Sequence, residues 1–180
     1  MLTELQTRKW TRLFDVYDTD GSGIVERRDF EIIFQNLAQV CNLKANSPEY
    51  NQLHTKFIED WEHLRKDTDK DNDGKVQLEE WLEHCDRRIQ DPSMYRTVVD
   101  IASQVFDLFD LDGNGVITVK EYKKVLSGWR VPEEIAEETF PKIDFNGDSL
   151  ISKDEFVELL RQFHTSDDPE APGNLFFGPY

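Results

Sequence analysis

Apolar residues recur at helical spacing along much of the chain. An amphipathic helix places apolar side chains at i, i+3, i+4 and i+7, so that they share one face. The two clearest stripes are Trp10, Leu13, Phe14 and Tyr17, and Ala102, Val105, Phe106 and Phe109. Weaker stripes lead up to Leu64 and to Ile143. Since such stripes normally face a core, the pattern predicts a helical protein.

Each stripe runs directly into a short acidic segment. The segments are residues 18–29 (DTDGSGIVERRD), 69–80 (DKDNDGKVQLEE), 110–121 (DLDGNGVITVKE) and 144–155 (DFNGDSLISKDE). All four have oxygen-bearing side chains at positions 1, 3 and 5 and an acid at position 12. One Ca²⁺ ion takes six to eight oxygens at about 2.3–2.6 Å, and a twelve-residue EF-hand loop supplies them at this spacing. A single acidic run could be a solvated turn, but four runs in one register predict EF-hand units.

The eighth position of every loop indicates how the loops pair. It is β-branched and apolar in all four: Val25, Val76, Ile117 and Ile151. Such residues favour a short strand by which two loops join. The predicted fold is therefore all-α, with four EF-hand helix–loop–helix units in two compactly packed pairs and short β-strands between paired loops.

The order of the loops predicts the domain organisation. Residues 1–91 form an N-terminal pair, residues 92–165 a C-terminal pair, and residues 166–180 a tail that folds back on the body. The boundary is placed at Asp91-Pro92-Ser93, the break between the second and third loops.

The second and third loops have complete ligand sets. Gly74 and Gly115 hold position 6, where the chain turns sharply and glycine has no steric penalty. Position 7 contributes its backbone carbonyl, so its side chain is free to vary. The predicted metal ligands are Asp69, Asp71, Asp73, Lys75 and Glu80 in the second loop, and Asp110, Asp112, Asn114, Val116 and Glu121 in the third.

The first loop differs at its last ligand. Its predicted ligands are Asp18, Asp20, Ser22, Ile24 and Asp29. Aspartate is one methylene shorter than glutamate, so Asp29 should struggle to give both oxygens to the ion. A lower coordination number favours Mg²⁺, which prefers octahedral geometry with shorter bonds. We expect this loop to bind Ca²⁺ more weakly than its neighbours and to hold Mg²⁺ in a resting cell.

The fourth loop differs at its turn. It keeps Asp144, Asn146, Asp148 and Glu155 but has Ser149 at position 6. A serine in the left-handed conformation costs about 1 kcal/mol, and Gly147 lies two positions too early to relieve it. Two interpretations stay open: weak ion binding, or a structural role as partner of the third loop.

The end of the chain is unusually apolar. It carries Leu175, Phe176, Phe177 and Tyr180, and prolines at 169, 172 and 179 exclude a regular helix there. We expect this segment to cover an apolar surface that a calcium sensor would present to a partner. The alternative is a frayed terminus.

With the loops placed, the chain resembles the invertebrate sarcoplasmic calcium-binding proteins, including those of the calexcitin type. The resemblance rests on the long stretch between the first two loops, which reads as a lengthened helical connection. It rests also on the closing segment from Ser166 to Tyr180 and on Asp29 at the end of the first loop. The resemblance implies two EF-hand pairs packed face to face, and a role in buffering or reporting cytosolic Ca²⁺ in muscle or neurons.

Charge and composition argue against nucleic-acid-binding, membrane-inserted and zinc-binding proteins. Asp and Glu number 37 against 21 Lys and Arg, a net charge of −16, which disfavours nucleic acid and anionic lipid. No apolar run reaches about 18 residues, so no membrane insertion is expected. Met1 and the residues after it carry neither signal-peptide features nor a myristoylation glycine, so a cytoplasmic protein is expected. Cys41 and Cys85 fit no zinc-ligand spacing.

An enzyme is not expected, because the sequence has no phosphate-binding glycine loop and no His-Glu-x-x-His motif, and its four histidines are scattered. Sensors of the calmodulin kind present a Met-rich groove, whereas this chain has two Met, twelve Phe and four Trp. A fixed aromatic core favours a monomeric Ca²⁺ buffer. The alternative is a sensor whose protein target is a membrane channel or receptor.

Overall fold

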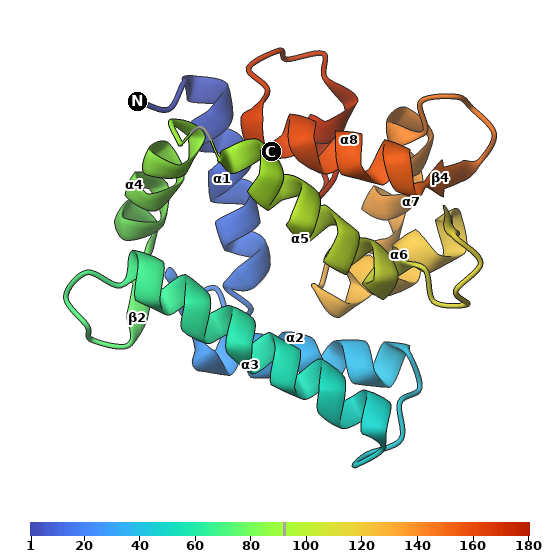
Figure 1. The fold of residues 1–180 in the computed structure, drawn as a ribbon, viewed down its shortest axis with the longest axis horizontal. Coiled ribbons are helices and arrows are strands. Elements are labelled where there is room, and N and C mark those ends of the chain that lie inside the picture. Colours follow the sequence, from blue (N-terminus) through green and yellow to red (C-terminus); the bar gives the residue numbers. More distant parts are fainter. Residues whose placement is uncertain (92) are drawn as a thin grey trace.

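The computed structural model describes residues 1–91 and 93–180 and is predominantly helical (Figure 1). In these ranges the helices are α1 (Glu4–Tyr17), α2 (Arg27–Val40), α3 (Pro48–Thr68), α4 (Leu78–Ile89), α5 (Met94–Phe109), α6 (Val119–Gly128), α7 (Glu133–Ile143), α8 (Lys153–Thr165) and the short 3₁₀ helix η1 (Pro172–Leu175). Four three-residue strands lie between them: β1 (Ile24–Glu26), β2 (Lys75–Gln77), β3 (Val116–Thr118) and β4 (Leu150–Ser152). The predicted fold class is confirmed.

The strands join the loops in two pairs. β1 is antiparallel to β2 with Val25 opposite Val76, and β3 is antiparallel to β4 with Ile117 opposite Ile151. These four side chains are buried. The eighth position of each loop therefore contributes both to the strand pair and to the core below it. Figure 1 shows β2 and β4 at opposite sides of the molecule.

The last ligand position of each loop also starts the following helix. Thr118 Oγ1 accepts a hydrogen bond from the Glu121 amide, and Glu121 Oε2 accepts from the Thr118 amide at 2.8 Å. Ser152 and Glu155 make the same reciprocal pair at the start of α8. A capping box of this kind satisfies two amides that a helix would otherwise leave free. One acid thus fixes both the end of the loop and the beginning of the helix.

The long stretch between the first two loops is a helix with a break before it. Helix α2 ends at Val40 and α3 begins at Pro48. Asn42 and Asn46 in the break have φ of 54° and 63°, in the left-handed region that asparagine tolerates. Ser47 then caps α3 by accepting from the Tyr50 amide at 3.2 Å. The predicted lengthened connection is this break followed by a 21-residue helix.

The two loop pairs contact each other through α2 and α6. Gly128 lies so close to Leu37 that a Cβ there would be 2.5 Å from Leu37 Cδ2. Asn36 Nδ2 donates to the Gly128 carbonyl at 3.1 Å, and Arg130 donates to the Thr19 carbonyl in the first loop. The glycine therefore permits a close helix–helix approach. The boundary expected at Pro92 lies outside the described residues.

The C-terminal tail packs into the C-terminal pair. Phe176 is fully buried, with its ring centroid 5.7 Å from that of Phe109 and 5.2 Å from that of Phe156. The Tyr122 hydroxyl donates to the Phe176 carbonyl at 2.7 Å. Burial raises the pKa of Tyr122, so this hydroxyl keeps its proton. The tail is thus part of the core formed by α5, α6 and α8.

A buried lysine ties the tail to the first helix. Lys9 Nζ donates to the carbonyls of Gln162 and Ser166 at 3.1 and 2.7 Å and to Asn174 Oδ1 at 2.8 Å. Burial lowers the pKa of Lys9 to about 8, while nearby Asp167 opposes that shift. The ammonium has three donors and three acceptors, so its hydrogen bonds are complete.

Candidate metal centres

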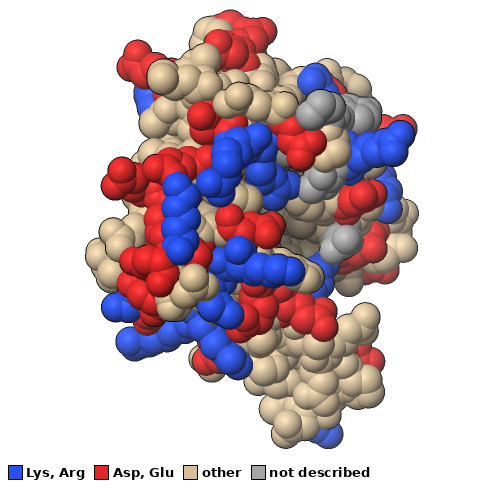
Figure 2. All heavy atoms as spheres, turned by 60° about the vertical axis from the view of Figure 1, so that its left-hand side comes forward, with Lys and Arg blue, Asp and Glu red and all other residues tan. Residues whose placement is uncertain are grey.

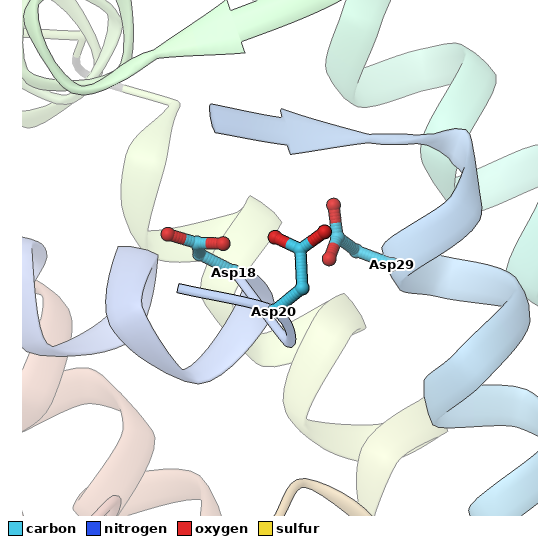
Figure 3. Close-up of side chains that lie close together, drawn as sticks. All are labelled: Asp18, Asp20 and Asp29. Carbon is cyan, nitrogen blue, oxygen red and sulfur yellow. The ribbon is translucent and has the colours of Figure 1, made fainter. Parts of the chain in front are cut away.

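The carboxylates of the first loop converge. Asp18 follows the last turn of α1, Asp20 lies in the loop, and Asp29 is in the first turn of α2. Figure 3 shows the three side chains pointing toward one another from these three elements. Each offers an oxygen within 4.8 Å of the others, and Asp29 is only 2% exposed. Three anionic groups this close repel one another, so a cation between them is favoured.

Two further clusters have the same form. Asp69, Asp71 and Asp73 converge in the second loop, and Asp110, Asp112 and Glu121 in the third. The first three loops thus each bring carboxylate oxygens within 4.8 Å, as the spacing predicts for three sites. Glu80 is not part of the second cluster; it accepts from the Lys70 and Gln77 amides at 3.0 Å each.

Backbone amides orient the first carboxylate of each loop. Asp18 accepts from the amides of Ser22 and Gly23 at 3.0 and 2.7 Å. Asp69 and Asp110 accept from positions 5 and 6 of their own loops in the same way, at 2.8–3.2 Å. These amides come from the far side of the turn, so they close the loop around the position of the ion.

The remaining predicted ligands lie where the loop enters its strand. Ile24, Lys75 and Val116, at position 7, are the first residues of β1, β2 and β3. Ser22 Oγ donates to the Ile24 carbonyl at 3.1 Å, and Asn114 Oδ1 accepts from the Val116 amide at 2.9 Å. The Ile24 carbonyl therefore lies beside the Ser22 hydroxyl, and the Asn114 side chain is held against the start of β3.

Asp29 takes the structural place of a longer glutamate. Its Oδ1 accepts from the Thr19 amide at 2.9 Å and its Oδ2 from the Glu26 amide at 2.9 Å. Glu121 makes the equivalent bonds to Leu111 and Thr118. Thr19 Oγ1 adds a further bond to Asp29 Oδ1 at 2.6 Å. Both oxygens of this short side chain are already engaged by the loop.

The fourth loop differs from the other three. Asp144 Oδ1 accepts from the Gly147 amide at 2.9 Å, one residue earlier than in the other loops. Among the described residues, Glu155 Oε1 is buried with no hydrogen-bond partner, whereas its equivalents in the other loops accept from the second residue. That second residue is Phe145, and its side chain is exposed. The fourth loop is therefore less completely closed.

Each loop has two left-handed residues, and the sequence interpretation recognised only one. Position 6 has φ of 80–87° in the glycines of the first three loops and 65° in Ser149. Position 4 also has positive φ: Gly21, Asn72, Gly113 and Gly147. Ser149 is left-handed as expected, and Gly147 does not relieve it; the glycine serves the earlier position 4, which was not predicted from the sequence. Glycine or asparagine at position 4 of every loop was the signal.

Comparison with known proteins agrees with this geometry. A family model of the EF-hand domain pair matches residues 99–161, and a model of the EF hand matches residues 67–85. The chain is 26% identical over 125 residues to calerythrin of Saccharopolyspora erythraea, covering 68% of the chain and 71% of calerythrin. It is also 26% identical over 123 residues to an uncharacterized calcium-binding protein of Caenorhabditis elegans. That match covers 68% of the chain but only 46% of the nematode protein, less than half of its length.

Solved structures show the same fold over the whole chain. The sarcoplasmic calcium-binding protein of amphioxus has a TM-score of 0.76 and 19% identity, with 100% of each chain covered. The coelenterazine-binding protein of Renilla muelleri, in a calcium-loaded apo form, has a TM-score of 0.79 and 22% identity, with 99% and 100% covered.

The helix–loop–helix units, the paired loops and the family models define the class: the chain is an EF-hand calcium-binding protein. Its fold is that of the sarcoplasmic calcium-binding proteins, as the resemblance implied. The prediction that it is not an enzyme is confirmed, because the chain matches EF-hand family models and the folds and relatives it resembles are named as binding proteins, among them the calcium-binding proteins of Caenorhabditis elegans and amphioxus. Within the described part of the chain, no helix combines the length and apolar character that crossing a membrane requires.

Proposed function

We propose that the chain is a cytoplasmic, monomeric Ca²⁺ buffer. Three ions bind in the first three loops, through the ligand residues named above for each loop. The support is the convergence of three carboxylate clusters, each held by the amides of its own loop. Three ions at +2 each would offset about six of the sixteen excess negative charges. Affinities of roughly 10⁻⁹–10⁻⁷ M are expected for a buffer.

The buried tail is the observation that favours a buffer over a sensor. Sensor EF-hand pairs open on binding Ca²⁺ and present an apolar groove to a target helix. Here Phe176 occupies the centre of the C-terminal pair, between the rings of Phe109 and Phe156. A target would have to displace a fully buried phenylalanine, and this opposes groove opening.

The four loops are proposed to differ in ion preference. Asp29 makes the same amide contacts as Glu80 and Glu121 but is one methylene shorter, so it gives the ion fewer oxygens and the first loop favours Mg²⁺ at rest. The fourth loop binds more weakly, because Ser149 has a left-handed backbone and Glu155 Oε1 is left without a partner. The two pairs, residues 1–91 and 92–165, act as one body through the contact of Gly128 with Leu37.

One structural neighbour is named for an organic ligand. The coelenterazine-binding protein is described in a calcium-loaded form, so one protein of this fold is named for an organic molecule and also holds calcium. We infer that a protein of this fold can bind calcium in its loops and an organic molecule elsewhere at the same time.

The proposal is tested by counting, on the same protein, the sites that bind Ca²⁺ and the apolar sites that bind a hydrophobic dye. Calorimetric titration should give three Ca²⁺ sites, of which the site in the first loop is the weakest. Titration with the neutral dye N-phenyl-1-naphthylamine should give the same number of dye sites in Mg²⁺ alone and after Ca²⁺ is added. A new dye site that appears only with Ca²⁺ would identify a sensor, acting on a protein target such as a membrane channel or receptor. Fewer than three Ca²⁺ sites would contradict the ligand assignment.

A further inference from the structure

A large cavity lies between the two EF-hand pairs and has a volume of about 630 Å³. Helices α1, α3 and α4 line it from the N-terminal pair, and α5, Trp129 and His164 line it from the C-terminal pair. Because its aromatic wall belongs mainly to the N-terminal pair, it is called the N-terminal cavity. The surface in Figure 2 is hollowed beside the tan projection at its lower right. Pockets of about 300–1,000 Å³ are the usual size for small organic ligands.

The deep wall of the cavity is aromatic. Trp10, Phe30, Phe57 and Trp81 line it and are all buried. The Trp10 and Trp81 rings meet edge to face, with centroids 5.9 Å apart, and Trp81 Nε1 donates to the Trp10 carbonyl at 2.9 Å. This bond holds the Trp81 indole against the backbone of α1, and the edge-to-face contact places it beside the Trp10 ring, so the wall presents aromatic surfaces to the cavity.

Two polar groups on the same wall are placed for a ligand. Trp10 is 4% exposed, and among the described residues its Nε1 has no hydrogen-bond partner. A buried donor without an acceptor costs about 1–3 kcal/mol, so an acceptor in the cavity would be favoured. His164 also lines the cavity, and its ring centroid is 5.0 Å from that of Trp10.

The imidazole of His164 supplies the complementary acceptor. Its Nδ1 lies 2.7 Å from the Leu160 carbonyl, which can only accept, so Nδ1 carries the hydrogen and Nε2 is left as an acceptor. Burial lowers the pKa of His164 to about 4, so the ring is neutral at physiological pH. One indole donor and one imidazole acceptor therefore lie side by side.

Charged residues of both signs line the cavity. They are the three cations Lys56, Arg88 and Lys124 and the four acids Glu49, Asp60, Asp107 and Asp110. The two signs differ by one charge, so the lining does not select a strongly charged molecule. A neutral ligand fits this lining and the aromatic wall.

We propose that this cavity binds one small, neutral, flat aromatic molecule that carries a carbonyl group, with the carbonyl accepting from Trp10 Nε1. The aromatic surfaces give the affinity and the indole–imidazole pair gives the orientation. A target helix is a poorer occupant, because its carbonyls are already bonded within the helix and cannot satisfy a buried indole donor.

Binding is measured first with N-phenyl-1-naphthylamine on the full chain loaded with Ca²⁺. We expect one saturable site, with energy transfer from tryptophan to the dye because Trp10 and Trp81 form the wall. Flavone, which is neutral and carries a carbonyl, should displace the dye. The absence of any saturable site would overturn the proposal, as would displacement by the helical peptide melittin without displacement by flavone.

A cavity-filling variant locates the site. Val105→Trp, on α5 and lining the cavity, should weaken dye binding at least tenfold. Val99→Trp is the matched control, because it makes the same change on the same helix outside the cavity lining. Equal dye affinity in both variants, with both folded by circular dichroism, would place the dye elsewhere and overturn the proposal.

A second pair of variants tests the hydrogen bond. Trp10→Phe removes Nε1 but keeps an aromatic ring, and it should weaken flavone about five- to tenfold, the effect of one hydrogen bond, with a smaller change for the dye. Trp129→Phe, which also lines the cavity, should change both affinities to a similar, small extent. Loss of dye and flavone affinity in equal measure in Trp10→Phe would contradict the role given to the indole donor. The ion count measured in the same proteins tests calcium binding separately.

Discussion

The two EF-hand pairs have similar loops but different centres. In the C-terminal pair, Phe176 of the tail fills the space between Phe109 and Phe156 and is fully buried. In the N-terminal pair, Trp10 and Trp81 instead face a cavity of about 630 Å³, which α5 and His164 of the C-terminal pair line on the other side. The repeated motif builds an apolar face in each pair. A segment outside the repeats, the C-terminal tail, covers this face in the C-terminal pair, whereas the face of the N-terminal pair borders the cavity.

Removing the filling residue should have the largest effect. Phe176→Ala should lower the free energy of unfolding by about 3–5 kcal/mol, because it leaves a cavity in a packed core. Urea unfolding of the Ca²⁺-loaded protein, followed by far-ultraviolet circular dichroism, measures this. Phe145→Ala is the matched control, since Phe145 is 41% exposed, and it should change stability by less than about 0.5 kcal/mol. Equal losses in the two variants would show that the tail does not stabilise the C-terminal pair.

Acid should destabilise the protein because His164, which lines the N-terminal cavity, is buried in its neutral form. The folded-state pKa of His164 is lowered from 6.5 to about 4, so the unfolded chain takes up its proton first as the pH falls. Stability is then lost between about pH 6.5 and pH 4, by about 2 kcal/mol at pH 5 for this residue.

The variant His164→Gln removes this titration while its amide can still donate to the Leu160 carbonyl. Its loss of stability between pH 7 and pH 5 should be smaller than that of the wild type by about 2 kcal/mol. The remainder belongs to other groups such as His84, whose pKa is lowered by burial and by Arg88. Parallel stability curves for the two proteins would contradict the assignment.

The fourth loop offers a smaller change in the C-terminal pair. Ser149 has φ of 65°, which glycine adopts without strain, so Ser149→Gly should stabilise the Ca²⁺-bound protein by about 1 kcal/mol and tighten this loop about fivefold. Gly147→Ala, at the other left-handed position, should act in the opposite direction. Calorimetric titration of both variants measures whether the Ca²⁺ affinity rises or falls. A change in the same direction in both variants would contradict the assignment of positions 4 and 6 as left-handed turns.

The smallest effect is expected in the first loop. Asp29→Glu lengthens the last ligand by one methylene, which should raise the preference of this loop for Ca²⁺ over Mg²⁺ while leaving the other loops unchanged. Site-resolved titration by nuclear magnetic resonance follows the Gly23 amide, which donates to Asp18. If the preference of this loop for Ca²⁺ over Mg²⁺ did not rise, the length of the Asp29 side chain would not explain its weaker Ca²⁺ binding.

The loops and their pairing could be predicted because their chemistry is local. The oxygen ligands at positions 1, 3, 5 and 12 and the β-branched residue at position 8 each act within one loop, and β1–β2 and β3–β4 pair as expected. The second left-handed turn was missed at Gly147, although glycine or asparagine at position 4 of every loop indicated it. The N-terminal cavity could not be predicted, because Trp10, Phe57 and His164 come together only through the packing of distant helices.

The most direct test of the difference between the two pairs is the number of N-phenyl-1-naphthylamine sites in Phe176→Ala compared with the wild type, both loaded with Ca²⁺ and both folded. We predict one site in the wild type, at the N-terminal cavity, and a second site in the variant where the phenylalanine ring has been removed. An unchanged number of sites would contradict the account that the tail fills the C-terminal pair while the N-terminal pair stays open.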